Sequence, residues 1–241
     1  KMDYKDLKIL YEDNHIIVVV KPAGIPTQAD DSNDIDMLNI IKQYLKEKYN
    51  KPGNVYLGLL HRLDRMVSGV MVFAKTSKAA SRISEYIRQK NVTKKYLAIL
   101  NGTIKKDEGQ HKLVNMLVKD SKNNISKVVE KETRGAKEAI LTYKVLKNFE
   151  YREKQYTLVD VNLETGRHHQ IRAQFSNIGH PLYGDIKYGL DVNKKGHNIA
   201  LFSYYLSFYH PTKDEYLEFE YYPDNTCNID KIWSYVNYGN R

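Results

Sequence analysis

A single carboxylate lies between two arginines in the segment HRLDRMVSG, residues 61–69. Arg62 and Arg65 flank Asp64, and nearby cations favour the ionised form of a carboxyl group. An ionised carboxylate can act as a nucleophile, bind a metal or form a structural salt bridge. The segment runs straight into the apolar stretch VMVFAK, which is typical of a strand. Because loops on a rigid scaffold often carry functional side chains, Asp64 is a candidate catalytic residue.

A second group of charged side chains lies in TGRHHQIRAQ, residues 165–174. Thr165 is expected to cap a helix that continues through RAQFSNIG. On that helix His168 and Arg172 would share a face, and Arg167 would lie at its start. The unpaired N–H groups and the positive end of such a helix can bind an anion. A capped surface helix with solvated arginines is the alternative interpretation.

No metal or cofactor signature accompanies these residues. His168 and His169 on one helix would diverge by about 100 degrees and chelate a metal poorly. The sequence has no HExxH, CxxC, GxxxxGK[ST], GxGxxG or GxSxG segment, and its one cysteine is Cys227. We therefore expect chemistry that uses neither a metal nor a cofactor.

The composition is that of a basic protein, which suits a polyanionic partner but does not by itself require one. The formal net charge is +9, and a surplus of this size attracts nucleic acid, although a lysine-rich surface can also serve solubility alone. The 20 tyrosines suit either base stacking or half-buried strands. No apolar run approaches the roughly 18 residues that span a membrane, and no signal peptide is visible. We expect a cytoplasmic protein that is not bound to a membrane.

Paired strands with a few helices between them would position these side chains. Strands are expected at 16–20, 70–75, 95–100, 139–146, 156–163, 201–208 and 215–221. Helices are expected at 37–49 after Asp36, at 78–90 after Ser77 and around Trp233. Residues 104–138 are expected to form a protruding hairpin, or alternatively a mobile loop. The pattern predicts an α+β fold in one domain, residues 1–241, with a central mixed, largely antiparallel sheet.

The segment HRLDRMVSG resembles HRLDxxTSG, the signature of the RluA class of pseudouridine synthases. Three further segments resemble motifs of that family and occur in the family's order: YEDNHIIVVVKPAG, KKYLAILNG and LETGRHHQIRAQFSNIGHPLYGDIKYG. The resemblance covers nearly the whole chain. It implies an RNA pseudouridine synthase with an active-site cleft across its sheet. The enzyme would isomerise a uridine of ribosomal or transfer RNA without a cofactor.

The resemblance also implies roles for individual residues. Asp64 would be the catalytic aspartate, Tyr96 would lie beside the target base, and Arg172 would pair with Asp64. Whether Asp64 attacks the ribose or abstracts a proton in a glycal route stays open. Arg62 would occupy the space that a flipped-out uridine leaves. RNA contacts are further expected from other basic side chains of these motifs, namely Lys21, Arg65, Arg167 and His168.

The chain departs from the family pattern at a few points. Val67 replaces the usual threonine, and His168 replaces a small threonine or serine. No S4 domain is expected ahead of the first strand, so RNA selection is expected from the catalytic domain and from residues 104–138. Asp185 and Tyr188 are expected to be architectural. We expect a monomer, and the alternative function is a catalytically silent RNA-binding relative or RNA chaperone.

Overall fold

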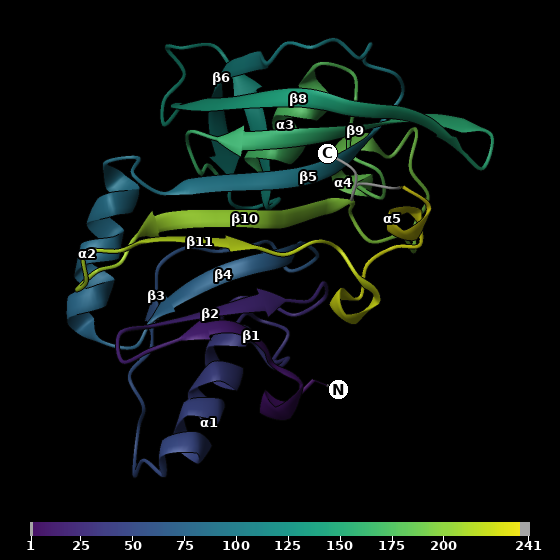
Figure 1. The fold of residues 1–241 in the computed structure, drawn as a ribbon. Coiled ribbons are helices and arrows are strands. Elements are labelled where there is room, and N and C mark those ends of the chain that lie inside the picture. The colour runs from purple at the N-terminus through teal and green to yellow at the C-terminus, as the bar shows by residue number, and fades with distance from the viewer. Residues whose placement is uncertain (1, 237–241) are drawn as a thin grey trace. The chain divides into compact units, whose positions relative to one another are not determined.

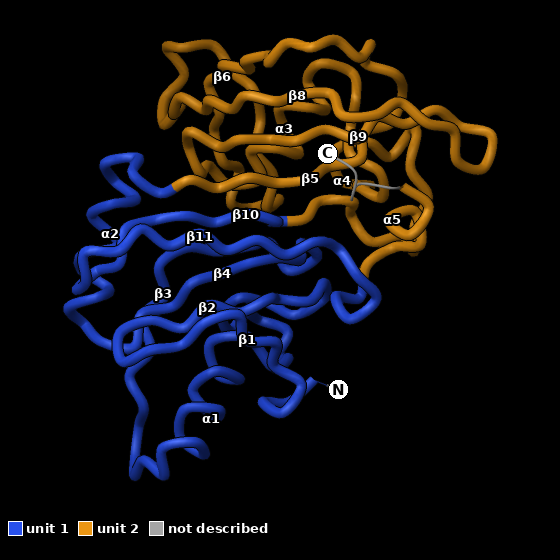
Figure 2. Tube along the Cα trace, in the orientation of Figure 1, with its two compact units in different colours: residues 1–92, 203–228 blue, residues 93–202, 229–241 orange. Residues whose placement is uncertain are grey.

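The computed structural model describes residues 2–236 and divides into two compact units. Unit 1 comprises residues 1–92 and 203–228, and unit 2 comprises residues 93–202 and 229–241 (Figure 2). Unit 1 is therefore discontinuous in sequence, because the chain builds most of unit 2 before it returns. Within residues 2–236, no helix is long and apolar enough to cross a membrane.

Unit 1 is built on the antiparallel strands β1 (Lys8–Glu12), β2 (Ile16–Lys21) and β4 (Ser68–Ala74), with the short β3 (Gly58–Leu59) paired to β4. Every residue of β2 is buried, as expected for an apolar strand that is covered on both faces. Alternate residues of β2 and β4 pack against Ala79 and Ile83 of α2 (Ser77–Arg88). The predicted strands at 16–20 and 70–75 are confirmed.

The helices of unit 1 begin at polar caps. Asp36 accepts a hydrogen bond from the N–H of Asn39 at the start of α1 (Met37–Tyr49), as predicted. The cap of α2 is Thr76 and not Ser77, because the Thr76 hydroxyl accepts from the N–H of Ala79. One-turn 3-10 helices, η1 (Tyr4–Asp6) and η2 (Asn225–Cys227), lie near the ends of the unit.

Residues 203–228 complete unit 1. The predicted strand pair is present as β10 (Leu201–Tyr209) and β11 (Tyr216–Glu220), which are antiparallel. The Cys227 carbonyl, in η2, accepts hydrogen bonds from the Ala23 N–H at 2.8 Å and the Ser68 hydroxyl at 3.3 Å. The end of the unit therefore contacts segments on both sides of the HRLDR loop.

Unit 2 contains an antiparallel sheet of five strands in the order β5 (Thr93–Asn101), β9 (Lys154–Leu163), β8 (Lys137–Tyr151), β6 (His111–Asp120) and β7 (Ile125–Val129) (Figure 1). One face is covered by α3 (Gln170–Asn177), whose Phe175 ring lies edge-on to Tyr143 with 5.1 Å between ring centres. The short helices α4 (Ile186–Gly189) and α5 (Ile232–Tyr235) complete the unit, and Trp233 lies in α5 as predicted. The elements confirm the predicted α+β class.

The hairpin predicted within 104–138 is present, although it belongs to the sheet and does not stand apart from it. Its strands are β6 and β7, and residues 111–117 of β6 pair with residues 137–143 of β8. The following strand pair is longer than predicted, and its turn is reduced to Arg152 and Glu153. Both turn residues have positive φ, which matches the tight hairpin turns that follow the twist of the strands.

Candidate active site

Asp64 lies in the loop between β3 and β4 of unit 1, and its side chain is half-buried. The Thr27 hydroxyl donates to the Leu63 carbonyl at 2.9 Å and accepts from the Leu63 N–H at 3.2 Å. On the other side, the N–H of the buried Val67 donates to the Asp64 carbonyl at 2.9 Å. These backbone contacts on either side fix the main chain that presents the carboxylate.

The amine of Lys21 also holds this loop. Its Nζ donates to the carbonyls of Pro22, Ile25 and Arg65 at 2.9, 2.6 and 2.9 Å. The side chain is fully buried, so the prediction that Lys21 contacts RNA is wrong. Burial lowers the pKa of Lys21 to about 7, although the nearby charge of Asp64 opposes that shift.

The two ends of the loop are tied to strands. At the start, His61 Nε2 accepts from the Val72 N–H at 3.1 Å. At the end, Gly69 has φ 134°, and a Cβ atom there would lie 2.2 Å from the Ser203 carbonyl oxygen. Glycine is therefore required where β4 approaches β10 so closely. The tight backbone predicted for Ser68-Gly69 is present.

The arginines on either side of Asp64 differ in their surroundings. Arg62 is exposed, and with the Gln28 amide oxygen turned toward it both Nη atoms donate to that oxygen, at 2.8 and 3.0 Å. Arg65 forms ion pairs with Asp30 and Asp34, which lie in the loop before α1. An RNA phosphate that binds Arg65 must compete with these carboxylates. RNA contact by either arginine stays a prediction.

Tyr96 and Arg172 both lie in unit 2. Tyr96 is in the middle of β5, opposite Val161 of β9, and only 7% of its surface is exposed. Since side chains alternate along a strand and Tyr143 lies beside Val161 on β8, Tyr96 shares the face that α3 covers. Arg172 belongs to α3 and is buried. The sheet and helix thus bring these two predicted residues to one side of unit 2.

Arg172 has a partner that the sequence analysis did not identify. Its Nε and Nη2 donate to the two carboxylate oxygens of Asp185, at 2.8 and 3.0 Å. Asp185 is fully buried and also caps α4 by accepting from the Tyr188 N–H. In the sequence, Asp185 can be recognised as a possible helix cap in GDIKYG, but no residue near it indicates that its partner is Arg172. The pairing of Arg172 with Asp64 stays a prediction.

The predicted anion site at Thr165–Arg167 is wrong, because α3 begins at Gln170 with His169 as its cap, four residues later than predicted. The Gln170 side chain reaches back and accepts from the Thr165 hydroxyl at 2.7 Å and from the Arg167 N–H at 3.0 Å. Thr165 also bonds the Ile140 N–H of β8. These contacts satisfy the groups that a helix start would otherwise direct outward.

His168 and His169 precede α3, so the predicted divergence on a helix does not apply. Their rings stack with 3.7 Å between centres. His168 lies 2.8 Å from the Ser126 hydroxyl through Nδ1 and 2.9 Å from Asn124 Oδ1 through Nε2. His168 therefore contacts the β6–β7 hairpin. The exposed Arg167 donates to the Glu138 carbonyl at 2.8 Å, and RNA contact by either residue is untested.

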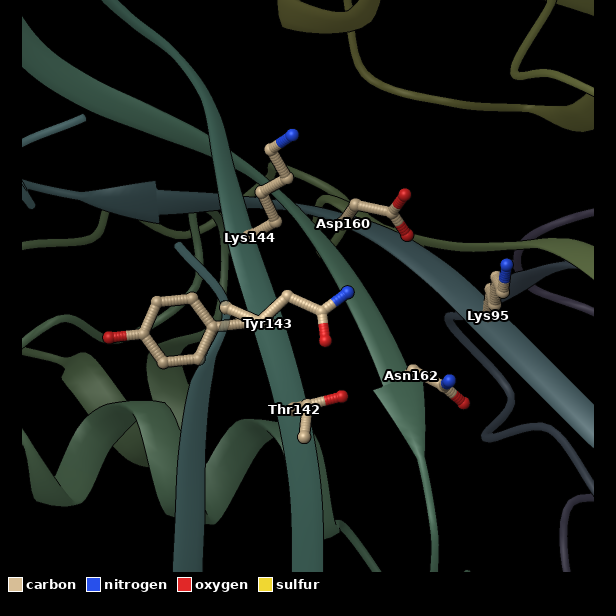
Figure 3. A pocket seen from close by; sticks show the side chains of 7 residues that line it. Lys95, Thr142, Tyr143, Lys144, Asp160 and Asn162 are labelled. Carbon is tan, nitrogen blue, oxygen red and sulfur yellow. The ribbon is translucent and has the colours of Figure 1, made fainter. Parts of the chain in front are cut away.

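A hollow of about 90 Å³ lies on the opposite face of the unit 2 sheet (Figure 3). Lys95, Thr142 and Asn162 form one row across three strands, and Lys144 and Asp160 form the next. None of the predicted catalytic residues lines it. Over residues 2–236, no group of three or more His, Cys, Asp or Glu side chains is arranged to hold a metal ion.

Comparison with known proteins places these motifs in a family. The family model described as RNA pseudouridylate synthase matches residues 15–177. The chain is 35% identical over 238 residues to an uncharacterised RNA pseudouridine synthase of Aquifex aeolicus (strain VF5), covering 94% of this chain and 72% of that protein. This chain belongs to the RNA pseudouridylate synthase family. The predicted RluA-class resemblance is confirmed, and the protein is an RNA-modifying isomerase.

Other relatives agree with this assignment. The ribosomal large subunit pseudouridine synthase D of Neisseria meningitidis serogroup A / serotype 4A (strain DSM 15465 / Z2491) is 34% identical over 226 residues, covering 89% of this chain and 57% of that synthase. The solved structure of human RNA pseudouridylate synthase domain containing 1 has a TM-score of 0.70 and 25% identity, covering 93% of this chain and 86% of that one. Both the sequence and the fold thus match pseudouridine synthases.

Proposed function

We propose that this pseudouridine synthase isomerises a uridine of large-subunit ribosomal RNA, with Asp64 as its catalytic carboxylate. The assignment of Asp64 as the catalytic carboxylate is supported by the hydrogen bonds that hold the main chain at Leu63, Asp64 and Arg65. A loop held on both sides presents its side chain in a fixed direction, as a catalytic group requires. The ribosomal substrate is taken from the relatives named for the large subunit, and transfer RNA is the second candidate.

The chemistry needs an ionised carboxylate and no external reactant. The bond between N1 of uracil and C1′ of ribose breaks, and a bond between C5 and C1′ forms. The proton on C5 is removed and N1 gains one, so atoms balance. Asp64 would attack C1′ or abstract a proton from the ribose, Tyr96 would assist removal of the C5 proton, and Arg172 would hold negative charge in the site.

Mapping of pseudouridine in total RNA, by carbodiimide adducts and reverse transcription, tests this proposal. A site that disappears when the gene is deleted should return with the wild-type gene but not with Asp64→Asn, which keeps the size of the side chain and removes its charge. On purified transcript, kcat of Asp64→Asn should fall by about 10³-fold or more. Asp31→Asn, a change of an exposed aspartate in the same unit, should leave kcat unchanged.

The outcomes separate the two candidate functions. If the wild-type protein binds RNA but forms no pseudouridine in any transcript tested, the catalytically silent alternative holds. If Asp64→Asn retains wild-type activity, the protein is a synthase but Asp64 is not its catalytic carboxylate. A lost site in transfer RNA instead of ribosomal RNA would correct the substrate alone.

A further inference from the structure

We propose that Asp185 and Tyr188 are positioning residues that fix the guanidinium group of Arg172, and that the β6–β7 hairpin holds Tyr188 in place. The inference rests on the proposed function, in which Arg172 acts in catalysis. Asp185 and Tyr188, which the sequence predicts to be architectural, would then act in catalysis through Arg172. The β6–β7 hairpin would support them.

The ion pair between Asp185 and Arg172 fixes a direction. Nε and Nη2 form one edge of the planar guanidinium, and both donate to the same carboxylate. Such a two-point contact determines the plane of the group and the direction of its opposite edge. Asp185 is 0% exposed and Arg172 7% exposed, so water does not compete for these bonds.

Stability alone is a weak explanation for this pair. Removing two charges from water costs several kcal/mol per ion, and apolar residues of similar size often stabilise a fold as well or better. A buried two-point pair on a predicted catalytic arginine is better explained by the orientation that it imposes. Asp185 is itself fixed, because its carboxylate accepts from the Tyr188 N–H at 3.3 Å.

Tyr188 restrains the guanidinium from a second side. The centre of its ring lies 5.0 Å from Arg172 Cζ, within cation–π range. Its hydroxyl accepts from the Ser126 N–H at 2.8 Å and lies 2.8 Å from His169 Nδ1. Burial and the charge of Arg172 lower the pKa of His169 to about 2, so the imidazole is neutral and its contact with the Tyr188 hydroxyl is a hydrogen bond between two uncharged groups. These two hydrogen bonds restrain the hydroxyl end of the ring, and so keep its face against Arg172.

The hairpin supplies the outer part of this support. Ser126, in β7, contributes its N–H to Tyr188 and its hydroxyl to the His168 carbonyl at 2.7 Å. Asn124, in the hairpin turn, accepts from Lys187 Nζ at 3.0 Å through its carbonyl. The turn thus contacts both the segment before α3, at His168, and α4, at Lys187, and so supports the helix that carries Tyr188.

Steady-state kinetics on an unmodified RNA transcript test the two positioning residues. Asp185→Asn should lower kcat by about 10²-fold, since misplacing a catalytic group by about 1 Å has an effect of that size, while KM changes little. Tyr188→Phe keeps the ring and loses the hydroxyl, and should lower kcat by about five-fold. Asp191→Asn and Tyr209→Phe change exposed side chains and serve as matched controls with unchanged kcat.

A double-mutant cycle shows whether Asp185 acts through Arg172. In an Arg172→Met protein, Asp185→Asn should cause no further loss of kcat, because the group that it positions is already absent. A full additional loss in that background would overturn the inference. An Arg172→Met protein with wild-type kcat would instead overturn the proposed role of Arg172.

Thermal unfolding distinguishes positioning from loss of fold. Asp185→Asn leaves a buried arginine without its partner and is expected to lower Tm, so its kinetics are compared at a temperature where it is folded. Tyr188→Phe retains the ion pair and decides the case if Asp185→Asn does not fold. A Tyr188→Phe protein with both wild-type Tm and wild-type kcat would contradict the inference.

Discussion

The buried amine of Lys21 helps to hold the Asp64 loop, because it donates a hydrogen bond to the Arg65 carbonyl. Its folded pKa is about 7, lowered from 10.5 by burial. Between these two pH values the unfolded chain binds the proton and the folded protein does not. The contribution of Lys21 to the free energy of unfolding therefore rises with pH across this window, and it is least favourable below pH 7.

We expect Lys21→Met to lose more stability at pH 9 than at pH 6.5. The wild-type protein gains from release of the buried proton as the pH rises, whereas methionine has no proton to release. The difference in the free energy of unfolding between the two proteins should grow by about 1–3 kcal/mol, measured by urea denaturation at each pH.

Lys195→Met provides the control for this measurement, because Lys195 is exposed. The difference in the free energy of unfolding between Lys195→Met and the wild-type protein should be the same at both pH values. If the difference for Lys21→Met also did not change with pH, the amine of Lys21 would not be buried in solution as it is in the structure.

Among the site residues, Asp64 could be singled out from the sequence because the arginines that mark it are its neighbours in the chain. Asp185 could not, because its bond to Arg172 joins residues thirteen positions apart, one within α3 and the other at the cap of α4. Lys21 was misassigned for a related reason. A lysine in a turn after a strand is usually solvated, and only the packing of residues 22–27 around it encloses the amine.

At the scale of elements, local patterns predicted the strands and helices that depend on local contacts. β2 and α1 were predicted nearly to the residue, because apolar periodicity and a capping aspartate mark them. The predicted start of α3 lies four residues too early. Its true position depends on Thr165, which bonds to Ile140 of β8, and no pattern near Thr165 encodes that partner.

The close approach of β4 and β10 leads to a prediction for Gly69→Ala. The added Cβ would meet backbone atoms of Ser203, which cannot turn aside as a flexible side chain can, and alanine disfavours φ 134°. We expect destabilisation by about 2–5 kcal/mol, measured as a lower midpoint of urea denaturation. Gly53→Ala also replaces a glycine of positive φ, but it meets no atom within 4 Å and should cost less. Equal losses of stability in Gly69→Ala and Gly53→Ala would mean that β4 does not approach Ser203 so closely.

At the scale of the whole molecule, the net charge of +9 predicts how RNA binding responds to salt. Each phosphate that a lysine or arginine neutralises releases counterions, so affinity falls as salt rises. We expect Kd for a substrate transcript to rise by about ten-fold or more between 50 and 200 mM KCl, measured by fluorescence anisotropy.

Asp64→Asn should show the same salt dependence as the wild-type protein, since a carboxylate does not neutralise phosphate. A constant Kd over this range would indicate that the surplus of lysine and arginine lies away from the bound RNA. The charge could be read from composition, but which basic residues touch RNA could not, as the ion pairs of Arg65 illustrate.

The return of the chain to unit 1 sets an order of events during synthesis. Residues 93–202, nearly all of unit 2, leave the ribosome before residues 203–228, and domains generally fold as units while the chain grows. Until residue 227 emerges, Ala23 and Ser68 lack the carbonyl that bonds them on either side of the HRLDR loop. Asp64 is translated before Tyr96 and Arg172, yet the bonds beside its loop cannot form until both of those residues have left the ribosome.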